Sequence, residues 1–222
     1  MDKLAIFDLD GTLLDTIADL GSSVNFMLRR HSLPEHRLED YKMMVGHGMR
    51  NLVTRALPEE MREETFIDGF LAGFLDCYLE HIDSYTKPYP GITEMLYSLQ
   101  DSGMHLAVAS NKIQAGTERL IHGFFPGIRF DAVLGNCSLY PLKPDPAVVD
   151  LILEMSGVPR AGAVMVGDSG TDIRTARNAS IPCIAVSWGF RPRQDLAEAD
   201  FIVDSSAGLL ERLKLYQASD AH

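Results

Sequence analysis

The sequence predicts an α/β fold in which a parallel sheet carries a separate helical segment. Over the second half of the chain, short apolar stretches rich in β-branched residues alternate with helical patterns. Strands that alternate with helices form parallel βαβ units, and strands that are apolar throughout are typical of a sheet covered by helices on both faces. The expected strands span residues 3–10, 105–110, 130–135, 163–168, 183–188 and 201–206.

A long segment without a strand pattern follows the first expected strand, from residue 15 to about residue 86. Over residues 66–82, apolar side chains recur at three- and four-residue spacings, which is the period of an amphipathic helix. A second helix is expected over residues 17–31, and two glycines interrupt a third helical pattern. The segment is therefore predicted to be an all-helical insert, from which the chain returns to the sheet near residues 85–90.

Length, charge and cysteine content exclude several classes of protein. The 222 residues are 46% hydrophobic and 23% charged, which is an average composition for a globular protein. The formal net charge is −11, and no stretch offers a basic surface, so neither nucleic acid nor a membrane is expected as a partner. Three cysteines without a CxxC pair argue against a disulfide framework and a zinc site. Since no signal peptide or membrane-spanning pattern is found, a cytoplasmic location is expected; the oligomeric state is not predicted.

Two carboxylates follow the first expected strand, in the stretch DLDGT at residues 8–12. Residues two apart in an extended chain point to the same side, so Asp8 and Asp10 can act together. Gly11 allows the backbone to approach an anion closely. A strand end followed by an Asp-Gly turn is the plain alternative, but the full string DxDGT is expected by chance in only about a few chains per thousand.

Two further polar clusters follow later expected strands, at the edge where open α/β sheets place their ligands. Ser110 and Asn111 offer a hydroxyl and amides at the expected start of a helix, where phosphate groups bind; a simple helix cap is the alternative. Lys143 precedes another expected helix, for which Asp145 is the expected cap. The prolines near Lys143 stiffen its segment and fix where the ammonium group points.

The last cluster, GDSGTD at residues 167–172, adds two carboxylates after the strand at 163–166. Together with Asp8 and Asp10, Asp168 and Asp172 would form a site of oxygen ligands for a hard cation. Among hard cations, Mg²⁺ fits this site best.

Taken in this order and with this spacing, the stretches DLDGT, ASNK, LKPDP and GDSGTD resemble the four motifs of the haloacid dehalogenase superfamily. The resemblance covers residues 1–14 and 88–222, where it implies a Rossmann-like catalytic core. The insert, residues 15–87, resembles the four-helix cap that small-molecule phosphatases of this superfamily carry.

The resemblance implies a phosphoric monoester hydrolase that works through an aspartyl phosphate. Asp8 would be the nucleophile, while Asp10 would first protonate the leaving oxygen and then activate water. Asp10 must then start protonated, which crowding by Asp8 and Asp168 would favour. Lys143 would act in catalysis by holding phosphate oxygens. The other implied phosphate-binding residues are Gly11, Thr12, Ser110 and Asn111; the implied Mg²⁺ ligands are Asp8, the backbone carbonyl of Asp10 and Asp168; the implied supporting residues are Ser169 and Asp172.

The loop VGHGMRNLV at residues 45–53 resembles the specificity loop of the phosphoglycolate phosphatase branch of the superfamily. Arg50 is then expected to bind a substrate carboxylate through a bidentate contact, and His47 is a second candidate. For each of them, a solvated loop residue is the alternative. The expected partner is therefore a small phosphorylated metabolite, with phosphoglycolate as the first choice.

Other activities within the superfamily stay open at this point. A sugar phosphomutase similar to β-phosphoglucomutase, a pyrophosphatase and a nucleotidase would all show the same four motifs. Outside enzymes of this kind, a phosphate-accepting signalling module or an inactive binding protein is conceivable. The intact pair of Asp8 and Asp10 argues against an inactive protein.

Overall fold

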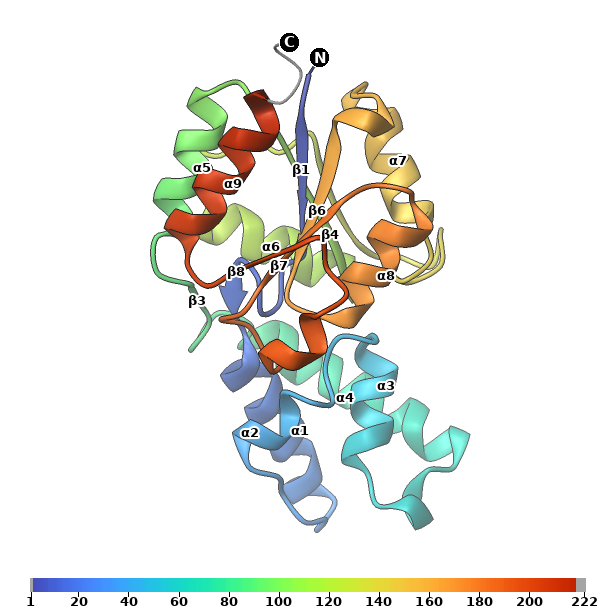
Figure 1. The fold of residues 1–222 in the computed structure, drawn as a ribbon. Coiled ribbons are helices and arrows are strands. Elements are labelled where there is room, and N and C mark those ends of the chain that lie inside the picture. Colours follow the sequence, from blue (N-terminus) through green and yellow to red (C-terminus); the bar gives the residue numbers. More distant parts are fainter. Residues whose placement is uncertain (1, 219–222) are drawn as a thin grey trace.

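A parallel six-stranded sheet forms the centre of the molecule (Figure 1), in a computed structural model that describes residues 2–218. The strand order is β5-β4-β1-β6-β7-β8, and each neighbouring pair is parallel. The strands are β1 (Leu4–Phe7), β4 (His105–Ile113), β5 (Ala132–Asn136), β6 (Ala163–Gly167), β7 (Cys183–Val186) and β8 (Phe201–Val203). The predicted α/β class with a parallel sheet is thereby confirmed.

Helices cover both faces of this sheet, which explains why its central strands are apolar throughout. In β1, Ala5 and Phe7 face one hydrophobic cluster, whereas Leu4 and Ile6 face the other. Helices α5 (Ile92–Asp101), α6 (Gln114–Phe124) and α9 (Ser206–Ala218) contribute to the first cluster. The second cluster includes α7 (Ala147–Ser156) and α8 (Gly170–Asn178). Two short 3-10 helices, η2 (Arg160–Gly162) and η3 (Arg193–Leu196), complete this part of the chain.

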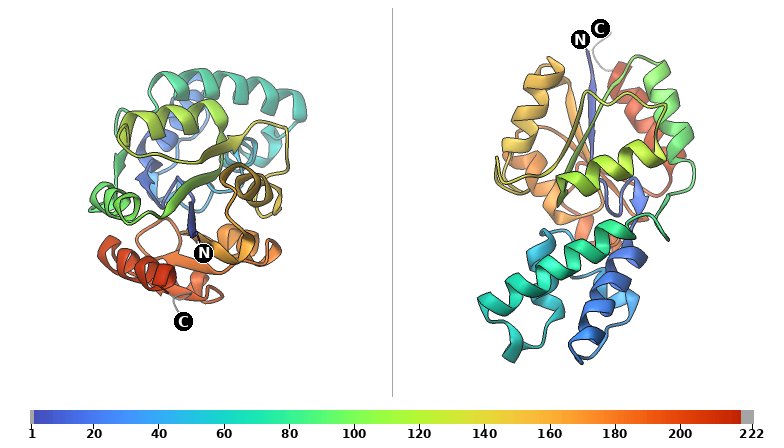
Figure 2. Two further views of the ribbon diagram at one scale, coloured as in Figure 1. Left: turned by 90° about the horizontal axis from the view of Figure 1, so that it is seen from above. Right: turned by 180° about the vertical axis from the view of Figure 1, so that it is seen from behind.

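The helical insert lies beyond the end of the sheet at which the strands have their carboxyl ends (Figure 1). It consists of α1 (Ile17–Arg30), α2 (Leu38–Tyr41), α3 (Met49–Ala56), the 3-10 helix η1 (Glu59–Met61) and α4 (Glu64–Glu80). Figure 2 shows α1 and α4 side by side in this region. None of the helices within residues 2–218 is both long and apolar enough to cross a membrane.

The chain leaves and re-enters the sheet region through two short strands that pair with each other. Strands β2 (Leu14–Asp15) and β3 (Lys87–Pro88) are antiparallel, with Leu14 opposite Pro88 and Asp15 opposite Lys87. Just beyond them, the buried carboxylate of Asp19 accepts hydrogen bonds from the backbone N–H groups of Tyr85 and Thr86 and from the Thr86 hydroxyl. Asp19 therefore fixes the two crossing segments side by side.

Two local boundaries differ from the predicted ones. Strand β4 continues to Ile113, with a shift in its pairing to β5 after Ala109, so Ser110 and Asn111 lie in a strand and not at a helix start. Helix α7 begins at Ala147, and Asp145 accepts a hydrogen bond of 2.9 Å from the Ala147 N–H. Neither difference moves Ser110, Asn111 or Asp145 away from the edge of the sheet where the strands have their carboxyl ends.

Candidate active site

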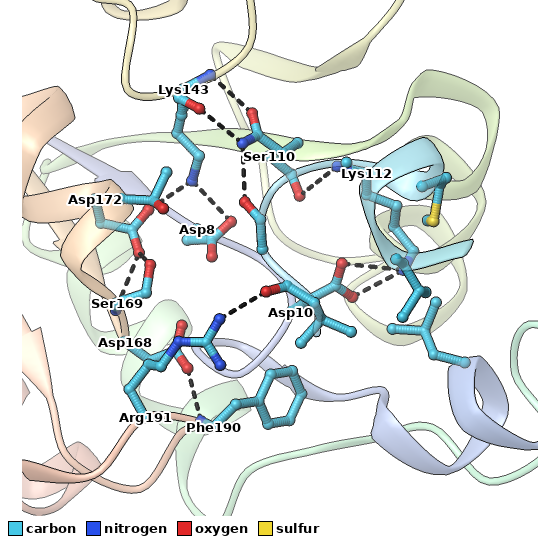
Figure 3. Close-up of a pocket in the computed structure, with 18 residues that line it drawn as sticks. Asp8, Asp10, Ser110, Lys112, Lys143, Asp168, Ser169, Asp172, Phe190 and Arg191 are labelled. Carbon is cyan, nitrogen blue, oxygen red and sulfur yellow. Dashed lines mark hydrogen bonds and ion pairs between the residues drawn. The ribbon is translucent and has the colours of Figure 1, made fainter. Parts of the chain in front are cut away.

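The predicted motifs meet at one edge of the sheet, where the strands face the helical insert (Figure 3). Asp8 and Asp10 follow β1, Ser110 lies in β4, Lys143 lies between β5 and α7, and Asp168 follows β6. All five line one cavity, which the insert closes on its other side. The residues that the insert contributes are Leu20, Val45, Gly46, Gly48, Met49 and Leu52. The centre of a water molecule can occupy about 40 Å³ of the cavity, which is room for a few waters.

Lys143 joins two carboxylates at the centre of the site. Its Nζ lies 2.9 Å from Asp8 Oδ1 and 2.6 Å from Asp172 Oδ1, and its side chain is 3% exposed. Burial opposes the charged form, but Asp172 and Asp8 outweigh it and raise the pKa of Lys143 above its usual value. The ammonium group is therefore charged, and its direction is fixed.

Asp172 holds this lysine in place while it also organises the start of α8. One of its oxygens forms the ion pair with Lys143. The other accepts hydrogen bonds from the Ser169 hydroxyl at 2.7 Å and the Ser169 N–H at 3.2 Å, which forms a capping box. Since both oxygens are occupied, Asp172 and Ser169 hold Lys143 and the start of α8 in place; the supporting role that the resemblance implies for them stays a prediction.

Asp168 lies in a tight pocket of backbone. Its Oδ2 accepts a hydrogen bond of 2.7 Å from the Phe190 N–H. A Cβ atom on Gly11 or on Gly189 would collide with the Asp168 side chain, and Gly11 also has a φ of +88°. Both positions therefore require glycine for the close approach to Asp168.

This packing gives the DLDGT turn a structural part, while its expected role in phosphate binding stays a prediction. Gly11 makes room for Asp168, and neither Gly11 nor Thr12 is among the residues that line the cavity. The Thr12 hydroxyl is buried and has no hydrogen-bond partner within residues 2–218. Its backbone carbonyl accepts a hydrogen bond of 3.1 Å from the Trp188 indole. The structure thus gives these two residues a part in shaping the turn.

Three buried carboxylates form a group that suits a divalent cation. One oxygen from each of Asp8, Asp168 and Asp172 lies within 4.8 Å of the others. Burial raises the pKa of Asp8 to about 7, against the effect of Lys143, and burial together with Asp172 and Asp8 raises the pKa of Asp168. A bound cation would offset this cost, and oxygen ligands are those that Mg²⁺ and Ca²⁺ prefer. With Asp172 engaged elsewhere, Asp8 and Asp168 are the carboxylates that could hold it.

Asn111 connects three separate parts of the chain. Its Nδ2 donates hydrogen bonds to the carbonyls of Lys143 at 2.9 Å and Gly46 at 3.0 Å. Its Oδ1 accepts one of 2.8 Å from the Lys143 N–H. Because these bonds use both N–H groups of the side-chain amide, the Asn111 side chain positions the Lys143 loop. The expected phosphate-binding role of this segment, which concerned the Ser110 hydroxyl and backbone amides, stays a prediction. Ser110, whose Oγ accepts a hydrogen bond from the Lys112 N–H at 3.2 Å, also lines the cavity.

The carboxylate of Asp10 faces away from the acidic group, toward Lys112 (Figure 3). Its oxygens lie 2.8 and 3.1 Å from the Lys112 Nζ, and one of them accepts a hydrogen bond of 2.7 Å from the Thr16 hydroxyl. The ammonium group of Lys112 is fully buried and lies 4.9 Å from the centre of the Tyr78 ring in α4. The expected crowding of Asp10 by Asp8 and Asp168 is therefore not the main feature of its surroundings, which are an ion pair and a hydroxyl.

The two residues predicted for substrate recognition lie outside the cavity lining. Arg50 is exposed at the start of α3, and its guanidinium is paired with Glu64 and Asp68 of α4. His47 is exposed in the loop before α3. Burial lowers the pKa of His47, with Arg191 as the next contribution. The structure thus does not bring Arg50 or His47 to the reacting groups.

Two cations at the site were not among the predicted residues. Lys112 belongs to the stretch ASNK at the end of the expected strand 105–110, but only Ser110 and Asn111 of that stretch were assigned a role. Arg191 lies in the loop after β7 and lines the cavity. A signal for Arg191 exists, because a loop that follows the carboxyl end of a sheet strand is where an α/β fold places binding residues.

The arrangement has counterparts in known proteins. The family model for haloacid dehalogenase-like hydrolases matches residues 5–186. A phosphoglycolate phosphatase of Agrobacterium fabrum (strain C58) is 36% identical over 217 residues, which cover 96% of this chain and 93% of that protein. One of Psychrobacter arcticus is 35% identical over 231 aligned residues, covering 99% of this chain and all of that protein.

Solved structures agree with the sequence comparison. The crystal structure of a protein from Lactobacillus delbrueckii subsp. bulgaricus superposes with a TM-score of 0.90 at 36% identity, and covers 96% of this chain and 98% of its own. The family match spans most of the chain, and the similar phosphatases align over nearly its whole length. The chain therefore belongs to the haloacid dehalogenase-like hydrolases and is an enzyme of that family.

Proposed function

We propose that this enzyme is a Mg²⁺-dependent phosphatase that releases phosphate from a small phosphorylated acid, with 2-phosphoglycolate as the substrate that fits best. The observation that carries the proposal is the buried Asp8, paired with Lys143 and adjacent to Asp168, in a cavity beneath the helical insert. Relatives named phosphoglycolate phosphatase, at 35–36% identity, support the same substrate.

Asp8 is the proposed nucleophile. Its carboxylate would attack phosphorus and form an aspartyl phosphate, and the alcohol of the substrate would leave. Asp8 and Asp168, with the backbone carbonyl of Asp10, would hold the cation. Bound Mg²⁺ would reduce the repulsion between a carboxylate and a phosphate dianion. Lys143, whose charge is maintained by Asp172, would hold a phosphate oxygen, and the Ser110 hydroxyl would donate to another.

Asp10 is the proposed acid and base. In the structure its carboxylate is paired with Lys112 and Thr16, so it must turn toward the leaving oxygen to deliver a proton. After the alcohol leaves, Asp10 would accept a proton from the water that hydrolyses the aspartyl phosphate. Both steps use the same carboxyl group in opposite directions, and the proton that it gives in the first step is restored in the second.

The helical insert, residues 15–87, is proposed to move as a cap on the core formed by residues 1–14 and 88–222. The paired strands β2 and β3 lie at this boundary and provide two adjacent hinges. Asn111 and Arg191 hold the loop around Gly46 against the core. With the cap in this position the cavity has room for only a few waters, so the cap would have to open for a phosphate ester to enter and for the products to leave.

The test is a phosphate-release assay over a panel of metabolites. The purified enzyme is assayed with Mg²⁺ or with EDTA, and kcat/KM values are compared among 2-phosphoglycolate, sugar phosphates, nucleotides and pyrophosphate. We expect the highest value for 2-phosphoglycolate and no activity in EDTA. Isomerisation of a sugar phosphate without phosphate release would contradict the proposal and favour a mutase. The cytoplasmic location stays a prediction that this assay does not address.

A further inference from the structure

Arg191 is a cation of the cavity for which the proposed mechanism has no use. It lies in the loop after β7, and its neighbour Phe190 donates the hydrogen bond to Asp168. Its side chain is half-buried and lines the same cavity as Asp8 and Lys143. Figure 3 shows it among the residues around the acidic group.

The hydrogen bonds of Arg191 leave part of the guanidinium unused. Its Nη1 donates to the Lys42 carbonyl and also contacts the sulfur of Met43, and its Nη2 donates to the Val45 carbonyl at 2.6 Å. A guanidinium has five N–H donors. Within residues 2–218 the Nε–H and one N–H of Nη2 have no acceptor, and no carboxylate lies within ion-pair distance of Arg191.

Other arginines of the chain make the difference clear. Arg50 is paired with two carboxylates of α4, and Arg193, only two residues beyond Arg191, is paired with Asp204. These pairs are exposed, where an ion pair contributes little. Arg191 instead combines partial burial with a charge that the described residues leave without an anion in direct contact.

Two more cations lie near the loop that Arg191 holds, in a chain whose net charge is −11, while Asp168, Asp195 and Asp172 also act on Arg191 itself at longer range than an ion pair. Arg55 of α3 and Arg174 of α8 are exposed and act on the same loop residue, His47, as Arg191 does. Neither of them takes part in an ion pair within the described part of the chain. Arg191, Arg55 and Arg174 together therefore favour an anion at this loop, while the neighbouring Asp8 and Asp168 favour a cation.

We propose that Arg191 binds the carboxylate at the non-reacting end of the substrate, with Arg55 and Arg174 attracting the anion toward it. The inference rests on the proposed function, since it assumes that the phosphate end lies at Asp8 and Lys143. A planar guanidinium with unused N–H groups matches a carboxylate in a bidentate contact. Because Arg191 also holds the carbonyls of Lys42 and Val45, the same residue ties substrate recognition to closure of the cap.

The experiment compares two substrates of the same shape and different charge. The first is 2-phosphoglycolate, and the second is glycolamide 2-phosphate, in which a neutral amide replaces the carboxylate. Steady-state kcat/KM is measured for the wild type, Arg191→Met and Arg193→Met. The ratio that matters is kcat/KM for 2-phosphoglycolate divided by kcat/KM for glycolamide 2-phosphate. We expect Arg191→Met to lower this ratio by about ten- to a hundredfold, because charge-assisted hydrogen bonds to the carboxylate are lost. Arg193→Met, a substitution of the same kind in the same loop, should leave the ratio unchanged.

Arg191→Met also removes two hydrogen bonds to the cap loop, at the carbonyls of Lys42 and Val45. We therefore expect kcat/KM to fall for both substrates as well, and the ratio of the two values is the readout that tests the inference. If both substrates lose activity by the same factor, Arg191 serves only to hold the cap, and the inference is wrong. If Arg50→Met changes the ratio instead, the carboxylate is bound at α3 and the inference is also wrong. Should Arg191→Met not fold, Arg191→Lys keeps the charge and should lower the ratio to a smaller extent. A wild type that releases no phosphate from either compound would refute the proposed function itself.

Discussion

The two carboxylates that follow β1 are only two residues apart, yet their surroundings differ. Asp8 lies among other buried carboxylates and shares the ammonium group of Lys143 with Asp172. Asp10 faces the helical insert and has the buried Lys112 as its own partner. Two acids that follow the same strand can thus be suited to separate tasks by the charges around them, one within the acidic group and one apart from it.

The two lysines also differ in how they are held. Lys143 lies in a loop that Asn111 fixes through two hydrogen bonds to the backbone of Lys143. Lys112 lies in β4, and its ammonium group contacts the ring of Tyr78 from the insert. The ion pairs on the Asp8 side therefore join residues of the core, whereas the Asp10 side includes a residue of α4. Mutations can test whether this division also separates two chemical steps.

The largest effect is expected from replacing the two acids one at a time. Asp8→Asn should lower turnover of every ester by about 10⁴-fold or more, since no nucleophile remains. The loss of kcat/KM in Asp10→Asn should depend on the leaving group. We expect a loss of about 10²- to 10⁴-fold for an alkyl phosphate, whose leaving group needs an acid, and a much smaller loss for p-nitrophenyl phosphate, whose leaving group does not. The measurement is kcat/KM for both esters with each variant.

Circular dichroism and thermal unfolding provide the control, because both variants should keep the fold. Asp8→Asn removes a carboxylate whose burial is costly, so its melting temperature should not fall below that of the wild type. Equal losses on the two esters for Asp10→Asn would show that Asp10 is not the leaving-group acid.

Lys112→Met should give the next largest effect, confined to the Asp10 side. Without the ammonium group, the Asp10 carboxylate loses its ion pair and its fixed direction. We expect kcat/KM to fall about ten- to a hundredfold for an alkyl phosphate and only slightly for p-nitrophenyl phosphate. A matched Lys214→Met substitution in exposed α9 should change neither value. A loss on both esters alike would mean that Lys112 contributes to the fold rather than to the position of Asp10.

Much of the fold could be predicted from the sequence because its signals are local. The stretch Leu4–Phe7 is apolar on both faces, and it became a central strand buried on both faces. The continuation of β4 to Ile113 could not be predicted in the same way. Lys112 is polar, and its burial depends on Asp10 and Tyr78, which are far away in the sequence.

The same distinction holds for the site. Residues that stand directly after a strand, such as Asp8 and Asp168, were found because the sheet edge alone places them. For Arg50 the sequence left open a solvated position beside the binding role, and it could not decide between them, since the outcome depends on how α3 packs against α4 and on the carboxylates that α4 presents. Arg191 was missed for a related reason: its contacts lie in the insert, almost 150 residues earlier in the chain.

A smaller effect concerns stability and pH on the Asp8 side. Burial raises the pKa of Asp8 to about 7, above its value in the unfolded chain. Between pH 4 and pH 7 the native protein therefore binds more protons than the unfolded one, so the contribution of Asp8 to stability falls as pH rises. We expect the melting temperature in EDTA to drop by on the order of 5 °C between pH 5 and pH 8.

Mg²⁺ should counteract this drop, because it favours the ionised carboxylates, and should raise the melting temperature more at pH 8 than at pH 5. Asp8→Asn in EDTA is the control: the drop should become smaller in this variant, while Asp168, whose pKa burial also raises, keeps part of the pH dependence. A melting temperature in EDTA that rises from pH 5 to pH 8 would contradict the assigned direction.

The smallest effect is expected from Tyr78→Phe, which probes the contact between the insert and the Asp10 side. The Tyr78 ring stacks on Phe74 with centroids 5.6 Å apart and lies under the ammonium group of Lys112. Its hydroxyl is buried and has no hydrogen-bond partner within residues 2–218. Phenylalanine keeps the ring and removes a buried polar group, so the free energy of unfolding in urea should stay the same or rise by up to about 1 kcal/mol. Tyr78→Leu removes the ring as well, and should produce a weaker form of the leaving-group dependence expected for Lys112→Met. If Tyr78→Phe reproduced that dependence, the hydroxyl rather than the ring would connect the insert to Asp10.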